Sequence, residues 1–346
     1  MAPRWYQSPL AVFVVVALAV AVLVLAVPPD SGTEVDVARL PTPAEGPAMA
    51  SVSPDPTYER RQVPRGGGVA SAIAEGAKGL DPVVVVTLAP NLTQHTVIWK
   101  QDGESRSQLL TPEDNGEATG LLALNTVVWH VLQGKAPDGQ RELGIVYDAS
   151  AFGSGSPTAR LALLRLEGDE WRVVWDSAEI EEWRGSHGDV EFPNGDLSEL
   201  VVRSDSWMDG YDELSDVLHE SNSGPHRYFV DTWILEGDKY VRQGAETVVA
   251  PYATLVKFLH VLSAGDEVSS SAQVMEAELV TRARDFGMDD APGRHWLVRC
   301  DDGFTCGIDE PIRFSPSRAR GEPPVAVYFE ERDGLWLISD IRPDDS

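Results

Sequence analysis

The chain has 346 residues, 42 % of them hydrophobic, which is enough for two folded domains with sizeable cores. Its 55 Asp and Glu residues against 28 Lys and Arg residues give a formal net charge of −27. A surface this acidic repels phosphate backbones and anionic headgroups, so nucleic acid is excluded as a partner. The acidic residues are scattered along the chain, which favours a solvated, self-repelling surface.

An apolar run without a charged side chain, Leu10–Val27, lies near the N-terminus. A helix of this length spans about 27 Å, close to the hydrocarbon thickness of a bilayer. Arg4 precedes the run and acidic residues follow it, so the positive-inside rule places residues 1–9 in the cytoplasm and the chain from Pro28 onward outside. The run therefore predicts a single-pass transmembrane signal anchor at the cell membrane. The alternative is a signal peptide that is cleaved from a secreted protein.

Residues 28–79 are rich in Pro, Ala, Gly and Ser and lack hydrophobic periodicity. They predict a disordered tether, with a short helical turn at 70–77. From residue 80 the chain changes to short runs rich in Val and Thr, such as Val83–Val86 and Thr96–Trp99, which favour strands. We therefore predict an antiparallel β domain over residues 80–249.

Two units with the same order of elements occur in this β domain. The first has a strand at Glu142–Tyr147 and a later hairpin tip at Glu167–Asp169. The second has a strand at Glu199–Val202 and a hairpin tip at Glu236–Asp238. Each tip reads Glu-Gly-Asp, and the glycine supplies the positive φ that a tight hairpin turn needs. Each unit therefore predicts a small antiparallel meander.

In the second unit the turn Pro193–Asp196 precedes the strand Glu199–Val202. An Asp-containing turn before a Leu-Val-Val strand resembles the FG-GAP and VCBS-type repeats that form β-propeller blades. The resemblance covers about Val83–Val248 and implies a β domain built of blade-like meanders.

The apolar period becomes helical at about residue 250. Pro251 suits a first helical turn, and apolar residues keep helical spacing up to Gly265. A capping box that begins at Ser270 predicts a second helix, which ends at Gly287. Strands follow, and the last hairpin turns at Asp333–Gly334.

Two helices before a curved antiparallel sheet resemble the NTF2-like, or cystatin-like cone, superfamily. The closing hairpin of that superfamily is similar to Val325–Glu330 with Trp336–Ile338. The resemblance implies an α+β domain over residues 250–346 that docks a ligand or a partner. Enzymes of the superfamily use an Asp/His pair inside the cone, and the residues that match are His295 with Asp285 or Asp289. The alternative for His295 is a hydrogen-bonded residue at the rim.

Cys300 and Cys306 flank the turn residues Asp301–Gly303. In an oxidising compartment such a close pair predicts a disulfide that staples a hairpin. Zinc would need further ligands, and a redox motif would have two residues between the cysteines instead of five.

An acidic stretch has the spacing of an EF-hand-like calcium loop, in which oxygen ligands surround a tight turn. Its candidate ligands are Asp205, Asp209, Glu213 and Asp216. Trp207 at the third position favours a plain acidic loop as the alternative. His187 and Asp189 also lie close together, but the sequence has no nucleophile elbow beside them, so they do not indicate catalysis.

We therefore expect a membrane-anchored, extracytoplasmic binding or assembly protein without catalytic activity or a cofactor. Its ligand, a protein or a small molecule, stays open. One alternative is a small-molecule enzyme with its site in the C-terminal cone, and another is a calcium-stabilised structural surface protein. The cone interior separates these hypotheses, because catalysis needs an open pocket with inward polar groups and a sealed apolar core provides none.

Overall fold

The computed structural model describes residues 69–74, 80–88, 94–110, 120–122, 126–150, 157–206, 214, 225–293, 296–300, 306–316 and 323–344. The chain divides into two compact units, Met1–Ala50 and Ser51–Ser346, and the described residues all belong to the second unit. The predicted anchor Leu10–Val27 lies outside the described residues. Within them, no helix is long and apolar enough to cross a membrane.

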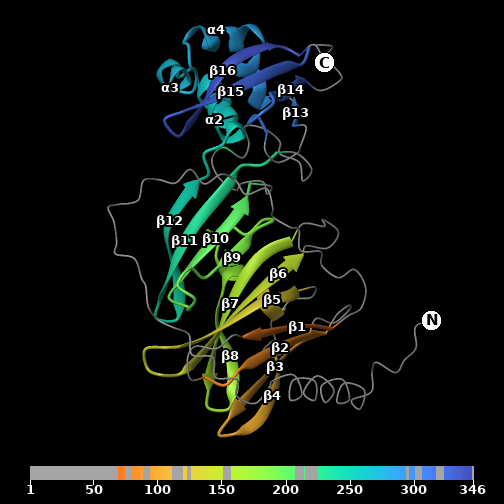
Figure 1. Ribbon diagram of the computed structural model, residues 1–346, viewed down its shortest axis with the longest axis vertical. Helices are drawn as coiled ribbons and strands as arrows, with labels where there is room; N and C mark the ends of the chain where they lie inside the picture. The colour runs from red at the N-terminus through yellow and green to blue at the C-terminus, as the bar shows by residue number, and fades with distance from the viewer. Residues whose placement is uncertain are drawn as a thin grey trace, which may run out of the picture. The chain divides into compact units, whose positions relative to one another are not determined.

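The described chain forms four antiparallel sheets of four strands each (Figure 1). The first sheet holds β1 to β4, at Val69–Ala74, Val83–Leu88, Gln94–Gln101 and Glu104–Leu110. The second holds β5 to β8, at Thr126–Lys135, Arg141–Ser150, Pro157–Glu167 and Glu170–Asp176. The third holds β9 to β12, at Asp189–Glu191, Glu199–Asp205, Tyr228–Glu236 and Lys239–Thr247. The fourth holds β13 to β16, at Trp296–Arg299, Ile312–Pro316, Val325–Arg332 and Leu335–Pro343. Neighbours in each sheet are consecutive in the chain, so every sheet is a meander.

The sheet β5–β8 is buried on both faces. Along β7, Leu161 and Leu163 belong to a core shared with β9–β12, whereas Ala162 and Leu164 belong to a core shared with β1–β4. Successive side chains of a strand point to opposite faces, so one unbroken apolar run serves two cores. The second sheet is therefore the middle layer between the first and the third.

The predicted hairpin tips are confirmed. Gly168 and Gly237 join β7 to β8 and β11 to β12 with φ values of 61° and 66°. Each occupies the left-handed region, which costs a residue without Cβ little. The glycine turns of these two hairpins could therefore be predicted from the sequence.

The predicted fold class is wrong, because the described chain is mostly antiparallel β, with 54 % strand and 17 % helix in four sheets. The prediction combined a transmembrane helix, one β domain with two meanders and an α+β NTF2-like domain. The structure adds a meander, β1–β4, whose first strand Val69–Ala74 was predicted as part of the tether. The Ala and Ser residues of this segment have little strand propensity, so its pairing with Val83–Leu88 decides the conformation.

Short helices pack on the fourth sheet (Figure 1). Helix α2, Pro251–Ser263, begins at the predicted proline. The predicted second helix is instead two pieces, α3 at Glu267–Ser271 and α4 at Glu278–Asp285. The Asp266 side chain caps α3, and the break follows where Val274 forms a parallel bridge with Ile338. The sheet thus takes over backbone groups that a continuous helix would need.

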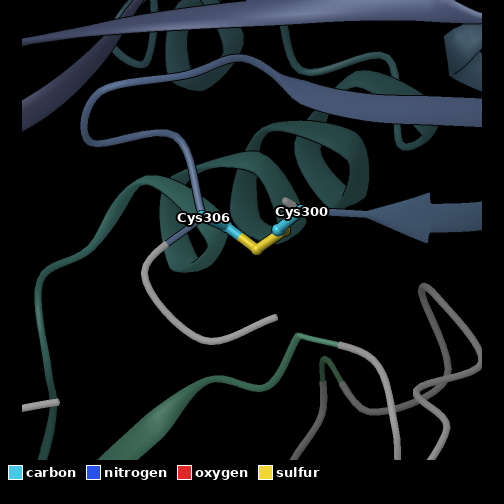
Figure 2. Close-up of a disulfide and its surroundings, with 2 residues drawn as sticks. All are labelled: Cys300 and Cys306. Carbon is cyan, nitrogen blue, oxygen red and sulfur yellow. A yellow bond between two sulfur atoms is a disulfide. The ribbon is translucent and has the colours of Figure 1, made fainter. Parts of the chain in front are cut away.

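The helices and the fourth sheet share a core of their own. Its buried side chains come from residues 252–341, and Trp296 stacks on Phe314 with ring centroids 3.9 Å apart. The predicted disulfide between Cys300 and Cys306 is confirmed, with Cys306 buried in this core (Figure 2). It joins the end of β13 to the turn before β14.

A buried histidine ties the first sheet to the second. His95 of β3 is 1 % exposed, and its Nδ1 lies 3.0 Å from the Thr87 hydroxyl. Its Nε2 lies 2.8 Å from the Thr126 hydroxyl and 3.0 Å from the Leu121 carbonyl oxygen. Burial lowers the pKa of His95 to about 4, because the charged ring would lose its hydration. The folded protein therefore holds a neutral ring at pH 7.

We expect the free energy of unfolding to fall as the pH drops from about 6.5 to about 4. In this window the unfolded chain protonates His95, at a pKa of 6.5, while the folded chain does not until about 4. Acid therefore favours the unfolded state, by about 3 kcal/mol when His95 is fully protonated. Urea unfolding at neutral and acidic pH measures the loss. His95→Gln should lose less stability in acid than the unaltered protein, and His260→Gln should lose as much. If His95→Gln lost as much stability as the unaltered protein, protonation of His95 would not be the cause.

We also expect residues 248–346 to fold alone as a soluble unit, because the core of this part is separate from those of the first three sheets. The purified fragment should give a far-UV spectrum of mixed strand and helix and a cooperative thermal transition under oxidising conditions. A molten or aggregated fragment beside a well-folded full chain would show that the boundary cuts a single core.

Candidate functional site

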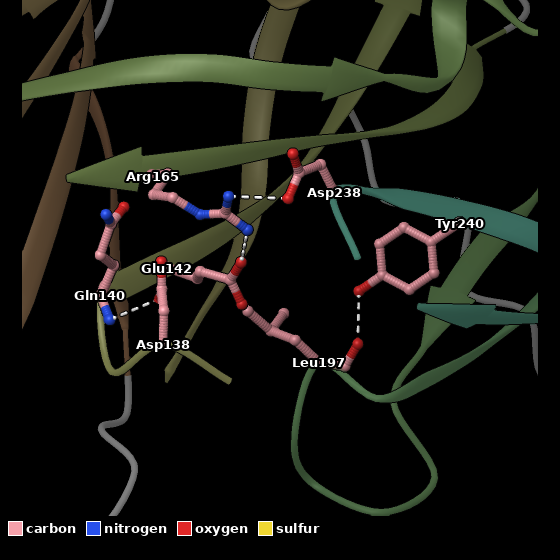
Figure 3. A network of polar contacts seen from close by, with 7 residues as sticks. All are labelled: Asp138, Gln140, Glu142, Arg165, Leu197, Asp238 and Tyr240. Carbon is pink, nitrogen blue, oxygen red and sulfur yellow. Dashed lines mark hydrogen bonds and ion pairs between the residues drawn. The ribbon is translucent and has the colours of Figure 1, made fainter. Parts of the chain in front are cut away.

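A buried ion pair joins β6 and β7 of the second sheet, and its arginine also reaches the third sheet (Figure 3). The Glu142 side chain is 2 % exposed and accepts a hydrogen bond from Arg165, whose second amino group lies 2.7 Å from Asp238 Oδ1. The hydrogen bond that Arg165 donates to Glu142 is the main reason that the pKa of Arg165 is raised. Nearby, the Tyr240 hydroxyl donates to the Leu197 carbonyl oxygen at 2.7 Å. These groups satisfy one another, so this cluster is a link between layers.

A second buried cluster centres on Asp176 at the end of β8. Its carboxylate accepts from the Tyr147 hydroxyl at 2.5 Å and from the Leu121 backbone N–H at 2.9 Å, in the short helix η2, Gly120–Leu122. Burial raises the pKa of Asp176 despite these hydrogen bonds. A Cβ at Gly120 would lie 2.3 Å from the carboxylate, so only glycine allows this approach. This cluster also serves the packing of the sheet.

Three other polar side chains form a cluster of a different kind. His187, Asp205 and His226 each bring one donor atom within 4.8 Å of the others. His187 Nδ1 lies 2.7 Å from Asp205 Oδ2, and the two imidazole centroids are 6.1 Å apart. Asp205 and His226 are buried, whereas the His187 side chain is 17 % exposed. Solvent therefore reaches the cluster on the side of His187.

A tight glycine loop positions His187 between two strands. A Cβ at Gly185 would lie 2.1 Å from the Ala159 carbonyl oxygen, and one at Gly188 would lie 2.3 Å from that of Arg203. His187 itself has a φ of 43°, in the left-handed region that few residues with a Cβ adopt. The loop is thus pressed between β7 and β10, and the backbone of His187 is held in a costly conformation.

Hydrogen bonds close to the strand ends hold the other two members. The Asp205 backbone N–H donates to the Ser186 carbonyl oxygen at 3.0 Å, which joins the glycine loop to β10. The Ser206 N–H donates to the Arg227 carbonyl oxygen, and the Arg227 N–H returns a bond to the Ser206 hydroxyl, each at 3.0 Å. These bonds bring the chain before β11 against the end of β10, so His226 lies beside Asp205.

Two imidazole nitrogens and a carboxylate oxygen in a partly buried cluster can do two kinds of chemistry. They can share protons in a hydrogen-bonded chain, with Asp205 orienting the His187 ring. They can also bind a metal ion, and this mixed donor set is typical for Zn²⁺ and related transition metals. Ca²⁺ is bound by oxygen ligands alone, so two histidines beside Asp205 disfavour a calcium site there.

Of the predicted calcium ligands, the structure describes only Asp205, so the calcium loop stays a prediction. This residue ends strand β10 and lies beside His187, whereas Asp209, Glu213 and Asp216 lie outside the described residues. The sequence also suggested Asp189 as the neighbour of His187, but in the structure the carboxylate beside the His187 ring is that of Asp205. His226 was missed entirely. The available signal was the Gly-Ser-His-Gly loop at 185–188, with a histidine between two glycines.

Two of the three predicted catalytic residues of the C-terminal part lie at the surface. Asp285 ends α4 and Asp289 lies in the short helix η4, Met288–Gly293, and both are exposed. His295 lies outside the described residues. The space between α2 and the sheet is filled by apolar side chains, with Phe258 and Phe314 both 0 % exposed. This filling disfavours a catalytic pocket in that place.

No family model, curated protein or solved structure matches the chain. The resemblances to FG-GAP and VCBS-type repeats and to NTF2-like domains therefore stay untested. Any functional proposal rests on the residues of this chain alone.

We expect Arg165→Met to destabilise the protein by about 3 kcal/mol, because it leaves the buried Glu142 carboxylate without its cation. Asp238→Asn is the control, since its side chain is 67 % exposed and its removal should cost less than about 1 kcal/mol. Urea unfolding at pH 7 measures both. Equal losses in the two variants would mean that the buried contact with Glu142 contributes nothing beyond the exposed contact with Asp238.

Proposed function

We propose that the chain is an extracytoplasmic binding or assembly protein without catalytic activity, held at the membrane by its apolar run Leu10–Val27. The single observation that carries the proposal is the Cys300–Cys306 disulfide. Disulfides persist in oxidising compartments and are rare where thiol reductants are abundant. The acidic composition, with a net charge of −27, supports a solvated surface that excludes nucleic acid.

The binding role is supported by how the polar groups are used. His95, Asp176 and Glu142 are buried and hydrogen-bonded. The bond of His95 to Thr126 links the first meander to the second, and the contact of Arg165 with Asp238 links the second to the third. A stack of meanders linked in this manner is a rigid framework, and rigid frameworks present loops and strand edges to partners. Asp285 and Asp289 are exposed, which removes the support for a catalytic site in the C-terminal part.

Location is tested on spheroplasts that carry the full chain. Added protease should digest residues 28–346, and the two cysteines should resist alkylation unless reductant is added. The control is a double variant, Val15→Asp with Leu18→Asp, in which two charges at the centre of the apolar run oppose membrane insertion. This variant should stay inside, protected from protease and with reduced thiols. Protection and free thiols in the unaltered protein would refute the location.

Binding is tested on the same spheroplasts with an amine-reactive cross-linker. Exposed lysines such as Lys100, Lys135 and Lys239 offer attachment points on three different strands. We expect a cross-linked species larger than the monomer for the unaltered protein and its absence for the double variant. A monomer that persists at saturating cross-linker would contradict a binding or assembly role.

A further inference from the structure

We propose that His187, Asp205 and His226 form a binding site for a divalent transition-metal ion of the Zn²⁺ type. This inference is independent of the proposed function, because it concerns a buried cluster and not the location or partners of the chain. The three donors lie within 4.8 Å of one another, and two of the side chains are buried. Two neutral imidazoles and one carboxylate carry a single negative charge, which a divalent cation more than neutralises. The strongly acidic chain further favours cations around it.

The distances fit an ion after small side-chain movements. Zn²⁺ bound to nitrogen and oxygen at about 2.1 Å in tetrahedral geometry places its ligands about 3.4 Å apart. His187 Nδ1 and Asp205 Oδ2, now 2.7 Å apart, separate slightly when the ion replaces the proton between them. No pair of donors lies more than 4.8 Å apart, so binding the ion needs at most about 1.4 Å of closing between any two of them.

The backbone around His187 is built for this placement. A residue with a Cβ adopts a φ of 43° only where its surroundings impose it, and such strain concentrates at functional sites. A Cβ at Gly185 or at Gly188 would clash with the carbonyl oxygen of Ala159 or of Arg203, so only glycine allows the loop to approach these strands so closely. The loop that carries His187 is also hydrogen-bonded to β7 and to the end of β10. Metal ligands held by such a supporting shell need no ordering when the ion binds.

The ion would join the loop that leads into the third sheet to a connection within that sheet. His187 lies in the loop between β8 and β9, whereas Asp205 and His226 lie at the two ends of the connection between β10 and β11. A metal bound to all three cross-links segments up to 39 residues apart, so it stabilises the folded state over the unfolded one. Among the described residues the site has three protein ligands, and its exposed side at His187 gives the ion a route from solvent and a water molecule a fourth position.

The test uses the full chain, purified in a mild detergent and freed of metal by dialysis against EDTA. Titration calorimetry with Zn²⁺ should show one tight site per chain, and mass spectrometry after gel filtration should find about one zinc bound. A saturating concentration should raise the thermal midpoint by roughly 5 °C, and the same concentration of Ca²⁺ should not. Co²⁺, used as an optical probe, should give the visible absorption of a tetrahedral or five-coordinate site.

Two variants and one control decide whether the cluster is responsible. His187→Asn removes a ligand at a partly exposed position where Asn tolerates positive φ, and His226→Gln removes the buried imidazole but keeps a polar side chain. Each should weaken Zn²⁺ binding by at least tenfold and abolish the thermal shift. His260→Gln makes the same substitution in helix α2, outside the cluster, and should bind as the unaltered protein does.

Because His187 is more exposed than the buried His226, His187→Asn should remain folded even where His226→Gln does not, and the metal-free thermal midpoint of each variant checks this. Unaltered protein that binds no Zn²⁺ would overturn the proposal and leave the cluster as a hydrogen-bonded group. Binding that persists at full strength in His187→Asn would place the ion elsewhere on the acidic surface and overturn it equally.

Discussion

Burial of both faces of the sheet β5–β8 is the interaction on which the described β region depends. Leu161 and Leu163 pack toward one neighbouring sheet while Ala162 and Leu164 pack toward the other, and all four are 0 % exposed. A fully buried Leu side chain contributes roughly 2 kcal/mol to stability. A strand segment that buries the side chains on both of its faces therefore contributes about twice the hydrophobic stabilisation of a segment buried on one face. The layers on either side are placed by this sheet, and so are the loops at their ends.

Polar groups between the layers give this packing its specificity. His95, Asp176 and Glu142 are withdrawn from water, and a buried polar group without a partner costs several kcal/mol. Asp176 and Glu142 have their partners, the Leu121 N–H and the Arg165 guanidinium, in or next to their own sheet. The bond from His95 to Thr126 and the contact of Arg165 with Asp238 cross between sheets. Apolar contact alone tolerates sliding of one sheet on another, whereas these two polar contacts do not. The layers therefore have one register.

The His187, Asp205 and His226 cluster is a consequence of that register. The loop at 185–188 fits against β7 of the middle layer and against β10 of the third sheet, and two glycines make the fit possible. The packing of the loop offsets the conformational strain of the left-handed backbone at His187. Packing against the middle layer thus places the His187 imidazole beside the Asp205 carboxylate of the third sheet. A metal ion there would reinforce the same contact that creates the site.

The sequence by itself determined features that depend on residues close together in the chain. The hairpin tips at Gly168 and Gly237, the start of helix α2 at Pro251 and the Cys300–Cys306 disulfide were all predicted, because turn, cap and close-pair chemistry is local. The tertiary structure decided the rest. Val69–Ala74 is a strand because it pairs with β2, and the chain between α3 and α4 is not helical because Val274 pairs with Ile338. His187, Asp205 and His226 meet because two meanders pack in one register, and that register depends on contacts between distant residues that no periodicity along the chain reveals.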